Sequence, residues 1–219
     1  MMTQSACAVS RHTFIAICLL GLYGFVPVRG MAQVQPEFVH LDMEALSIPA
    51  VSALEFDEFG FLWIGTVSGL VRYDGVTYRH YRTNPEDSTT IGANYVKHQG
   101  LLSDGDGSLW VLHNGMVISR LDLHLDSWVR YDQQYGWGEG LENMTPASIT
   151  KDAAGVIWVT FTSVVPGNDE VKLARYNARA DAFLVQSFPV SEEEQQFKPL
   201  LLAQLSDGRF FGAGRKLQT

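Results

Sequence analysis

The stretch that decides the fold is Asp57-Glu-Phe-Gly60-Phe-Leu-Trp63, in which aspartate stands six residues and glycine three residues before tryptophan. The same spacing returns as Asp104-Gly-Asp-Gly107-Ser-Leu-Trp110 and as Asp152-Ala-Ala-Gly155-Val-Ile-Trp158. The tryptophans lie 47 and 48 residues apart, and a decayed fourth copy has Phe211 in the tryptophan place. Self-similarity at a period of roughly 20 to 50 residues marks a repeat architecture, so the sequence predicts several copies of one supersecondary unit.

Each repeat has the pattern of four short strands. Apolar and polar residues alternate over 51–56, and the Asp-x-x-Gly turn leads into a second strand that contains the tryptophan. Asp74-Gly75 is a strong hairpin signal between the third and fourth strands. Four-stranded units at this spacing are typical of propeller blades. We therefore expect an all-β chain that forms a partial β-propeller of about three and a half blades, at residues 50–82, 93–132, 145–188 and, in part, 198–214.

The beginning of the chain differs from the repeats. Arg11 precedes an apolar stretch over 14–28, and Gly30-Met31-Ala32 supplies small residues at the −3 and −1 positions of a signal peptidase site. An uncleaved membrane anchor is the alternative, although fifteen residues reach about 22 Å against a hydrocarbon core of about 30 Å. We therefore expect a signal peptide over 1–32 and an incomplete propeller over 33–219, exported and without cysteine, because Cys7 and Cys18 lie in the leader.

The charge of the expected mature chain excludes one class of partner. After Arg11 and Arg29 are removed, 14 basic residues face 24 acidic ones. A surface of this sign repels phosphate backbones, so nucleic acid is not expected as a partner. No cofactor motif is present in the sequence, and none is expected.

The first repeat carries a family resemblance. Residues 57–75 read Asp-x-x-Gly-Phe-Leu-Trp-Ile-Gly-Thr followed by Gly-Leu-x-Arg-Tyr-Asp-Gly, which resembles the two-component regulator propeller repeat. The segment over 81–94 is also similar to the linker between blades of that family. The resemblance covers about residues 36–214 and is looser in the later repeats, where Leu112-His113-Asn114 replaces the usual Gly-Thr.

The resemblance implies a periplasmic segment of a bacterial two-component or diguanylate cyclase receptor that senses an extracellular ligand, in many members a glycan fragment. Such receptors signal through a histidine kinase or cyclase domain, and neither has a signature in this sequence. We therefore expect a truncated, non-catalytic sensor fragment. Its expected partners are a glycan or other small ligand, together with the missing remainder of the propeller or a second copy of the chain.

Two other functions stay open at the level of sequence. An incomplete propeller can act as a structural protein whose exposed strand edges join another chain. A glycan-active propeller enzyme is the third candidate, but the position five residues before each tryptophan holds Glu58, Gly105 or Ala153 in place of the aspartate of sialidase-type repeats. No catalytic residue is therefore assigned.

A metal site is not expected either. Asp104-Gly-Asp106-Gly-Ser108 alternates oxygen ligands, but the twelfth position from Asp104 is Gly115, whereas a helix–loop–helix calcium loop needs glutamate there. A hairpin turn is the simpler interpretation of this stretch.

Ligand-binding residues are expected on the loops at one end of the blades, because functional residues favour loops on a rigid scaffold. Trp137 is the main candidate, since it is a large aromatic residue between two glycines and outside the repeat pattern. An aromatic residue that covers a blade edge is the alternative. His113 and Tyr95 are further candidates. The repeated residues are assigned to structure, and the tryptophans to packing between blades: Asp57, Gly60, Trp63, Asp104, Gly107, Trp110, Asp152, Gly155 and Trp158.

Overall fold

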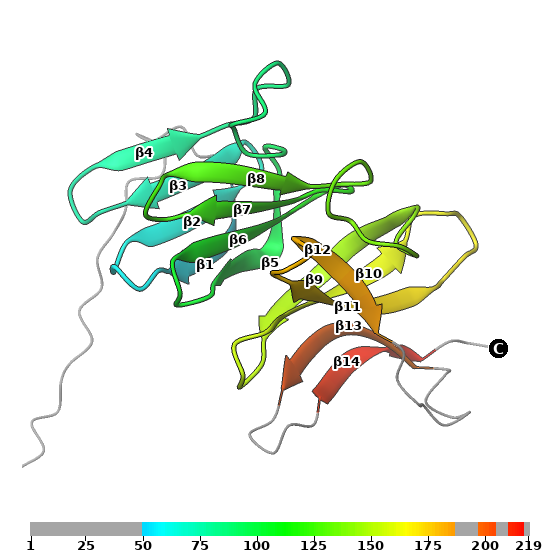
Figure 1. Cartoon of the computed structure of the whole chain (residues 1–219). Helices are drawn as coiled ribbons and strands as arrows, with labels where there is room; N and C mark the ends of the chain where they lie inside the picture. Colours follow the sequence, from blue (N-terminus) through cyan, green and yellow to red (C-terminus); the bar gives the residue numbers. More distant parts are fainter. Residues whose placement is uncertain (1–49, 187–196, 205–209, 217–219) are drawn as a thin grey trace, which may run out of the picture. The chain divides into compact units, whose positions relative to one another are not determined.

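The computed structural model describes residues 50–186, 197–204 and 210–216 (Figure 1). The signal peptide expected over 1–32 lies outside these residues. The same holds for residues 33–49 and 187–196 of the expected propeller.

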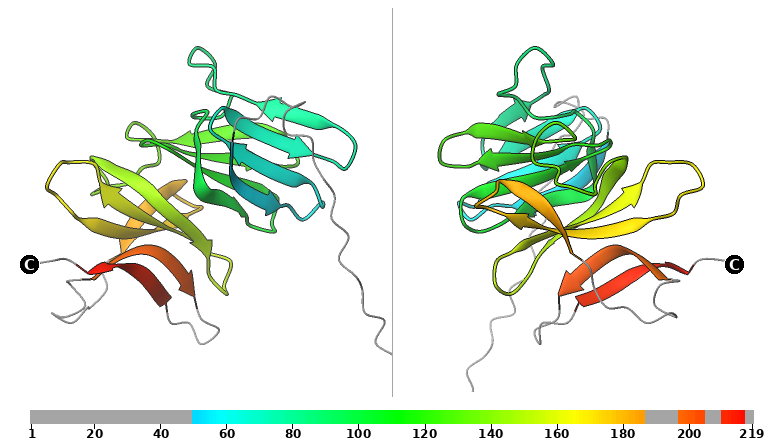
Figure 2. Two further views of the ribbon diagram at one scale, coloured as in Figure 1. Left: turned by 180° about the vertical axis from the view of Figure 1, so that it is seen from behind. Right: turned by 45° about the vertical axis from the view of Figure 1, so that its right-hand side comes forward.

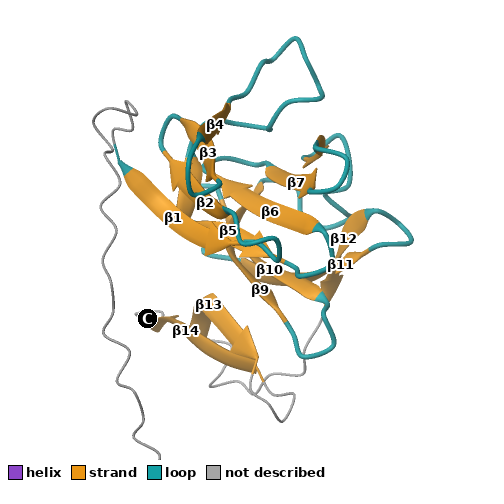
Figure 3. Ribbon diagram, turned by 90° about the vertical axis from the view of Figure 1, so that its left-hand side faces the viewer, coloured by secondary structure: helices purple, strands orange, loops and turns teal. Residues whose placement is uncertain are grey.

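The described residues form strands and loops without any helix (Figure 3). The first sheet contains β1 (Val51–Phe56), β2 (Leu62–Thr66), β3 (Gly69–Tyr73) and β4 (Tyr78–Tyr81). The second contains β5 (Val96–Ser103), β6 (Ser108–His113), β7 (Ile118–Asp122) and β8 (Ser127–Tyr131). The third contains β9 (Met144–Lys151), β10 (Ile157–Ser163), β11 (Val171–Asn177) and β12 (Ala182–Gln186).

A two-stranded sheet of β13 (Phe197–Gln204) and β14 (Phe210–Lys216) follows in the chain. Within every sheet the strands pair antiparallel in sequence order, so each sheet is a meander (Figure 2). This arrangement confirms the all-β, propeller-like fold class that the repeats predict.

The Asp-x-x-Gly turn owes its conformation to the aspartate and the glycine. In the first sheet, Asp57 Oδ1 accepts hydrogen bonds from the backbone N–H groups of Phe59 and Phe61, and Gly60 has a φ of +83°. Only glycine adopts this left-handed conformation without a steric penalty. Asp57 Oδ2 accepts a third hydrogen bond, of 2.8 Å, from the indole Nε1 of Trp63.

The other two sheets repeat this turn. Asp104 and Asp152 accept the equivalent backbone hydrogen bonds, and their Oδ2 atoms accept from Trp110 and Trp158 at 3.4 and 2.8 Å. Aspartate and tryptophan are therefore six residues apart because the carboxylate in the turn accepts a hydrogen bond from the indole of the following strand.

Two buried clusters join consecutive sheets. Trp63 and Tyr81 of the first sheet pack with Leu109, Val111 and Leu121 of the second. Trp110 of the second sheet packs in the same way with residues of the third sheet, among them Val159, Phe161 and Phe183. Burial of large apolar side chains at about 25 cal/mol per Å² is the main stabilising contribution, so the blades are held together chiefly by their tryptophan faces.

The first strand of every sheet, which we call its inner strand, carries a β-bulge at the same place in the repeat (β1, β5, β9 and β13). One extra residue opposes the second strand in three of them, namely Ser52, Ala147 and Leu200. In β5 the four residues 97–100 oppose the single residue Leu112. Three residues of β5 are therefore extra, which is two more than in each of the other three inner strands.

Candidate ligand-binding loops

The linker from β4 to β5 is built around an arginine of the neighbouring strand β8. Arg130 Nε donates to the carbonyl of Thr90 at 2.8 Å, and its Nη2 donates to the carbonyl of Asp87 at 2.7 Å. Gly92 N also donates to Ser119 Oγ at 2.9 Å. A guanidinium group offers five donors in a fixed plane, so one side chain holds the loop over the second blade.

Tyr95 and His113, two of the residues expected to bind a ligand, lie together at one end of β5 and β6. Asn114 N donates to the carbonyl of Tyr95 at 2.9 Å, and Val96 pairs with His113. Tyr95 is 44% exposed, whereas His113 is fully buried and its Nε2 lies 2.9 Å from Ser119 Oγ. Burial lowers the pKa of His113 to about 4, so its ring is neutral at ordinary pH. Ligand binding by both residues stays a prediction.

Trp137, the third candidate, points into the protein. Its ring is 3% exposed, packs edge-on against Phe161 at 5.1 Å between centroids, and donates from Nε1 to the carbonyl of Leu141 at 2.8 Å. The indole therefore belongs to the core between the second and third blades, as the alternative of a covering aromatic residue describes. Contact of its remaining exposed edge with a ligand stays a prediction.

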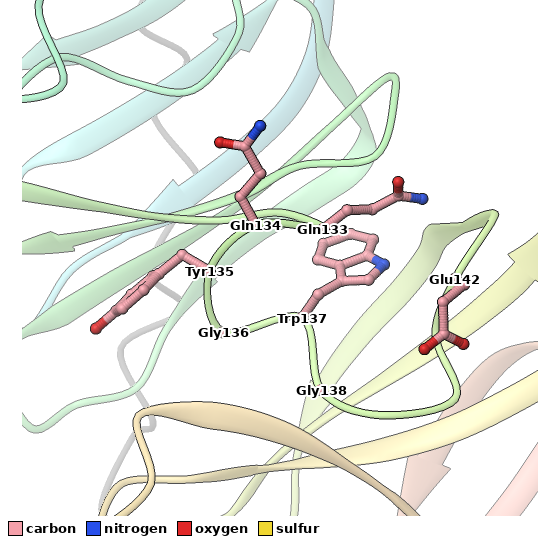
Figure 4. A pocket seen from close by; sticks show the side chains of 7 residues that line it. All are labelled: Gln133, Gln134, Tyr135, Gly136, Trp137, Gly138 and Glu142. Carbon is pink, nitrogen blue, oxygen red and sulfur yellow. The ribbon is translucent and has the colours of Figure 1, made fainter.

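Residues of this loop line a cavity of about 320 Å³ (Figure 4). The backbone N–H groups of Glu142 itself and of Gly140 hold the pKa of the Glu142 carboxyl below its usual range, so it is charged at neutral pH. Polar groups of the cavity wall can form hydrogen bonds with a small polar ligand, and Glu142 supplies its one carboxylate. The lining residues are Gln133, Gln134, Tyr135, Gly136, Trp137, Gly138 and Glu142.

A cluster that the sequence did not predict lies nearby, around Asp181. The phenol groups of Tyr131 and Tyr135 each donate to this carboxylate at 2.7 Å, and that of Tyr176 donates at 2.5 Å. Burial alone would raise the pKa of Asp181, but these three hydrogen bonds and the nearby Arg120 hold it below its ordinary value. Burial in turn raises the pKa of Tyr131.

The first two blades share a smaller form of this contact. Tyr81 at the end of β4 donates to Asp126 at 3.2 Å, just as Tyr131 at the end of β8 donates to Asp181. Both acceptors lie in the hairpin between the third and fourth strands of the next blade and have positive φ angles of 52° and 46°. We call each such pair a tyrosine latch. The recurrence of tyrosine at the end of the fourth strand, and of aspartate in the next hairpin, was the signal in the sequence.

The described part of the chain contains neither a cluster of metal ligands nor a helix that could span a membrane. No three His, Cys, Asp or Glu side chains among residues 50–186 come close enough to hold a metal ion. In the part of the chain that the structure describes, no helix has the length and apolarity to cross a membrane.

Comparisons with solved structures give weak similarities to parts of longer domains. The extracellular domain of the hybrid two-component system BT3049 from B. thetaiotaomicron matches with a TM-score of 0.36 and 19% identity, over 80% of this chain and 34% of that domain. The corresponding domain of BT4673 matches with a TM-score of 0.40 and 18% identity, over 78% and 25%. The N-terminal domain of Nup159 matches with a TM-score of 0.32 and 14% identity, over 67% of this chain and 50% of that one.

Sequence comparison gives one local relationship. No protein-family model matches the chain. Over 74 residues, or 32% of its length, it is 42% identical to histidine kinase P4 of Formosa agariphila. The matched part spans 5% of that protein. The resemblance to two-component sensor proteins, drawn from residues 57–75, is confirmed by this local identity with a histidine kinase.

Proposed function

We propose that the chain is an extracytoplasmic sensing segment of a two-component or diguanylate cyclase receptor, and that it contributes ligand recognition without covalent chemistry. The observation that carries this proposal is the 42% identity over 74 residues with a histidine kinase. The fold agrees with it, since a repeat of rigid blades displays loops at its ends and buries the residues between them.

The loops favour recognition over catalysis. The cavity beside Trp137 contains one carboxylate, that of Glu142, whereas general acid–base hydrolysis of a glycosidic bond uses a pair. Its amide and backbone groups are suited to hydrogen bonds with a small polar ligand. In this function the blades hold the loops in place, and the loops bind the ligand.

The size of the native protein tests the proposal. A sensing segment acts only when it is joined to an output domain, so an antibody against residues 50–186 is expected to detect a membrane-bound protein much larger than 24.3 kDa in cells of the source organism. A product of 24.3 kDa or less would contradict the sensor and favour a free interaction protein.

Export has its own test. Fusion of residues 1–50 to alkaline phosphatase, which is active only outside the cytoplasm, is expected to give an active enzyme. Deletion of the apolar stretch 14–28 is the matched control, and it should abolish the activity. Activity that survives the deletion would refute the proposed signal.

A further inference from the structure

The extended bulge of β5 is the place where the second blade departs most from its neighbours. Four residues, 97–100, oppose Leu112, whereas the bulges of β1 and β9 each contain one extra residue. An inner strand needs only one extra residue to follow the curvature of its blade, as the other two show. The curvature of the blade therefore does not require the two additional residues, and bulges of this kind commonly re-aim side chains beside binding sites.

The bulge holds its backbone in a costly conformation. Gln99 has a φ of +54°, a left-handed conformation that residues other than glycine rarely adopt. The next residue, Gly100, has no room for a side chain, because a Cβ atom there would lie 2.8 Å from the carbonyl oxygens of both Leu112 and Lys97. Strain of this kind persists only where the surrounding structure enforces it, and it is frequent at ligand sites.

The bulge also places a cation without a counter-ion. Lys97 is half-buried, and its Nζ donates to the carbonyl of Pro146 in β9 at 2.6 Å. Among residues 50–186, no carboxylate lies within ion-pairing distance of it, unlike Arg79, Arg120 and Lys172. Burial lowers its pKa below the ordinary range. An ammonium group has three donors, so two N–H groups of Lys97 are left for another acceptor.

The two following side chains point outward. His98 and Gln99 are both exposed, and within the described part of the chain neither forms a hydrogen bond through its side chain. The bulge thus presents an ammonium, an imidazole and an amide in three consecutive residues. A partly desolvated cation followed by two hydrogen-bond donors is complementary to a single negative group.

We propose that the bulge Lys97–Gln99 binds the carboxylate of a small acidic ligand. Lys97 supplies the charge, and His98 and Gln99 supply hydrogen bonds that fix the orientation. The net charge of −8 disfavours a polyanion over the whole surface, so the ligand is a small molecule with one or two carboxylates. This assignment names a ligand class for the proposed sensing function and rests on it.

The test compares succinate with succinamide, which has the same carbon chain without the charge. Each is titrated into the isotope-labelled full chain at constant ionic strength, and the NMR signals of the His98 ring and the Gln99 amide are followed. Succinate should give saturable shifts with a dissociation constant on the order of 1 mM, and succinamide should bind at least about tenfold more weakly. Absence of saturable shifts, or equal binding of the two compounds, would overturn the proposal.

Two variants locate the charge. Lys97→Met keeps the apolar stem and removes the ammonium, so succinate should bind about tenfold more weakly. Lys172→Met is the matched control, because Lys172 Nζ also donates to a backbone carbonyl, that of Gly140 at 2.5 Å. Binding by the control should be unchanged, and equal losses in both variants would contradict the site.

Gln99→Gly separates ligand binding from a purely structural bulge. Glycine relieves the positive φ, so the melting temperature should rise by roughly 2–4 °C. The variant should nevertheless bind succinate about threefold more weakly, because one donor is lost. A stabilised variant with unchanged binding would remove Gln99 from the site. Because these measurements concern binding alone, their failure leaves the test on the native protein's size unaffected.

Discussion

At the scale of the residue, the aspartate of the repeat joins the turn to the tryptophan of the following strand. Asp57 accepts two backbone hydrogen bonds in its turn and one from the indole of Trp63, and Asp104 and Asp152 do the same. Asparagine could accept the backbone bonds but would place an amide N–H near the indole donor. Glutamate would carry its carboxylate one methylene farther from the backbone. The motif thus specifies aspartate through two requirements at once.

Asp57→Ala should destabilise the protein by about 2–4 kcal/mol, because it leaves a buried indole donor and two backbone donors without their acceptor. Urea denaturation followed by circular dichroism measures the change. Asp106→Ala is the matched control, since Asp106 lies in the equivalent turn of the second blade and is exposed. A similar loss in both variants would mean that the hydrogen bonds of Asp57 contribute little.

The three tyrosines around Asp181 make the free energy of unfolding depend on pH. The pKa of Asp181 is lowered in the folded protein, so its contribution is fully present above the ordinary value near 3.8 and is lost as the pH falls through the lower folded value. Tyr131→Phe removes one of its three donors. The variant should therefore lose about 1–2 kcal/mol at pH 7 and less at a pH below the folded pKa of Asp181, where the carboxylate is neutral.

The control for this prediction is Tyr73→Phe. Tyr73 donates to the exposed carbonyl of Gly75 and, among the residues that the structure describes, has no carboxylate partner, so its loss should be small and independent of pH. Chemical denaturation of both variants at the two pH values measures the difference. A loss in Tyr131→Phe that is equal at both values would contradict the role of the charged carboxylate.

At the scale of the element, the linker between β8 and β9 depends on glycines for its close approach to the third blade. Gly138 has a φ of +83°, and a Cβ atom there would lie 1.8 Å from the carbonyl oxygen of Phe183. Gly167 has a similar φ of +77° but open space around it. The two glycines therefore differ in contact and not in backbone conformation.

Gly138→Ala should cost about 3 kcal/mol or more, whereas Gly167→Ala should cost only about 1 kcal/mol from its backbone conformation. Thermal unfolding followed by circular dichroism gives both values. The difference between them measures the clash with Phe183. Equal costs would mean that the linker moves away from the third blade without loss, and that the buried position of Trp137 is not essential.

The strands could be predicted from the sequence, whereas the bulges and the orientation of Trp137 could not. Alternation and turn signals are local, and they mark β1 to β4 within residues 51–81. The bulge of β5 depends on which residues of β6 pair with it, and that register is set by contacts distant in sequence. Trp137 is likewise buried by Phe161 of another strand, so its exposed and covered orientations could not be distinguished from the sequence.

At the scale of the whole molecule, polar contacts join the blades in addition to the apolar clusters. Glu58 in the first turn accepts hydrogen bonds from Gly107 N and Ser103 Oγ of the second blade. Lys151 of the third blade donates to the carbonyl of Asp104 at 2.5 Å. In a repeat protein, stability is approximately the sum of the stabilities of the repeats and of the interfaces between neighbours. These contacts therefore determine how strongly local unfolding of one blade destabilises the next.

Glu58→Ala should loosen the first blade more than the third. The loss of two hydrogen bonds at the interface, about 0.5–1.5 kcal/mol, should accelerate amide exchange in β1 and β2 by about two- to tenfold. Hydrogen exchange measured by mass spectrometry resolves this pattern. Glu139→Ala, at an exposed loop position, is the control and should change nothing. Acceleration spread evenly over all three blades would contradict nearest-neighbour coupling.

The tyrosine latches have a consequence for how such a chain can evolve by duplication. The Asp–Trp hydrogen bond lies within one repeat, so a copied repeat brings its own folded turn to any place in the gene. A latch spans two repeats, and the first and third blades each lack one of its two residues. In the first blade Arg72 pairs with Arg79, whereas in the second blade the equivalent Arg120 pairs with Val129, so the hairpin of the first blade is two residues shorter. This shorter hairpin lacks the acceptor aspartate. At the other end of the described blades, Gln186 stands where Tyr81 and Tyr131 stand in the other blades. Exchange of the first and second repeats would therefore leave Tyr131 opposite a hairpin without an acceptor, while Tyr81 would face that of Asp181. One latch would be lost, so the order of the repeats in the gene is constrained although their folds are alike.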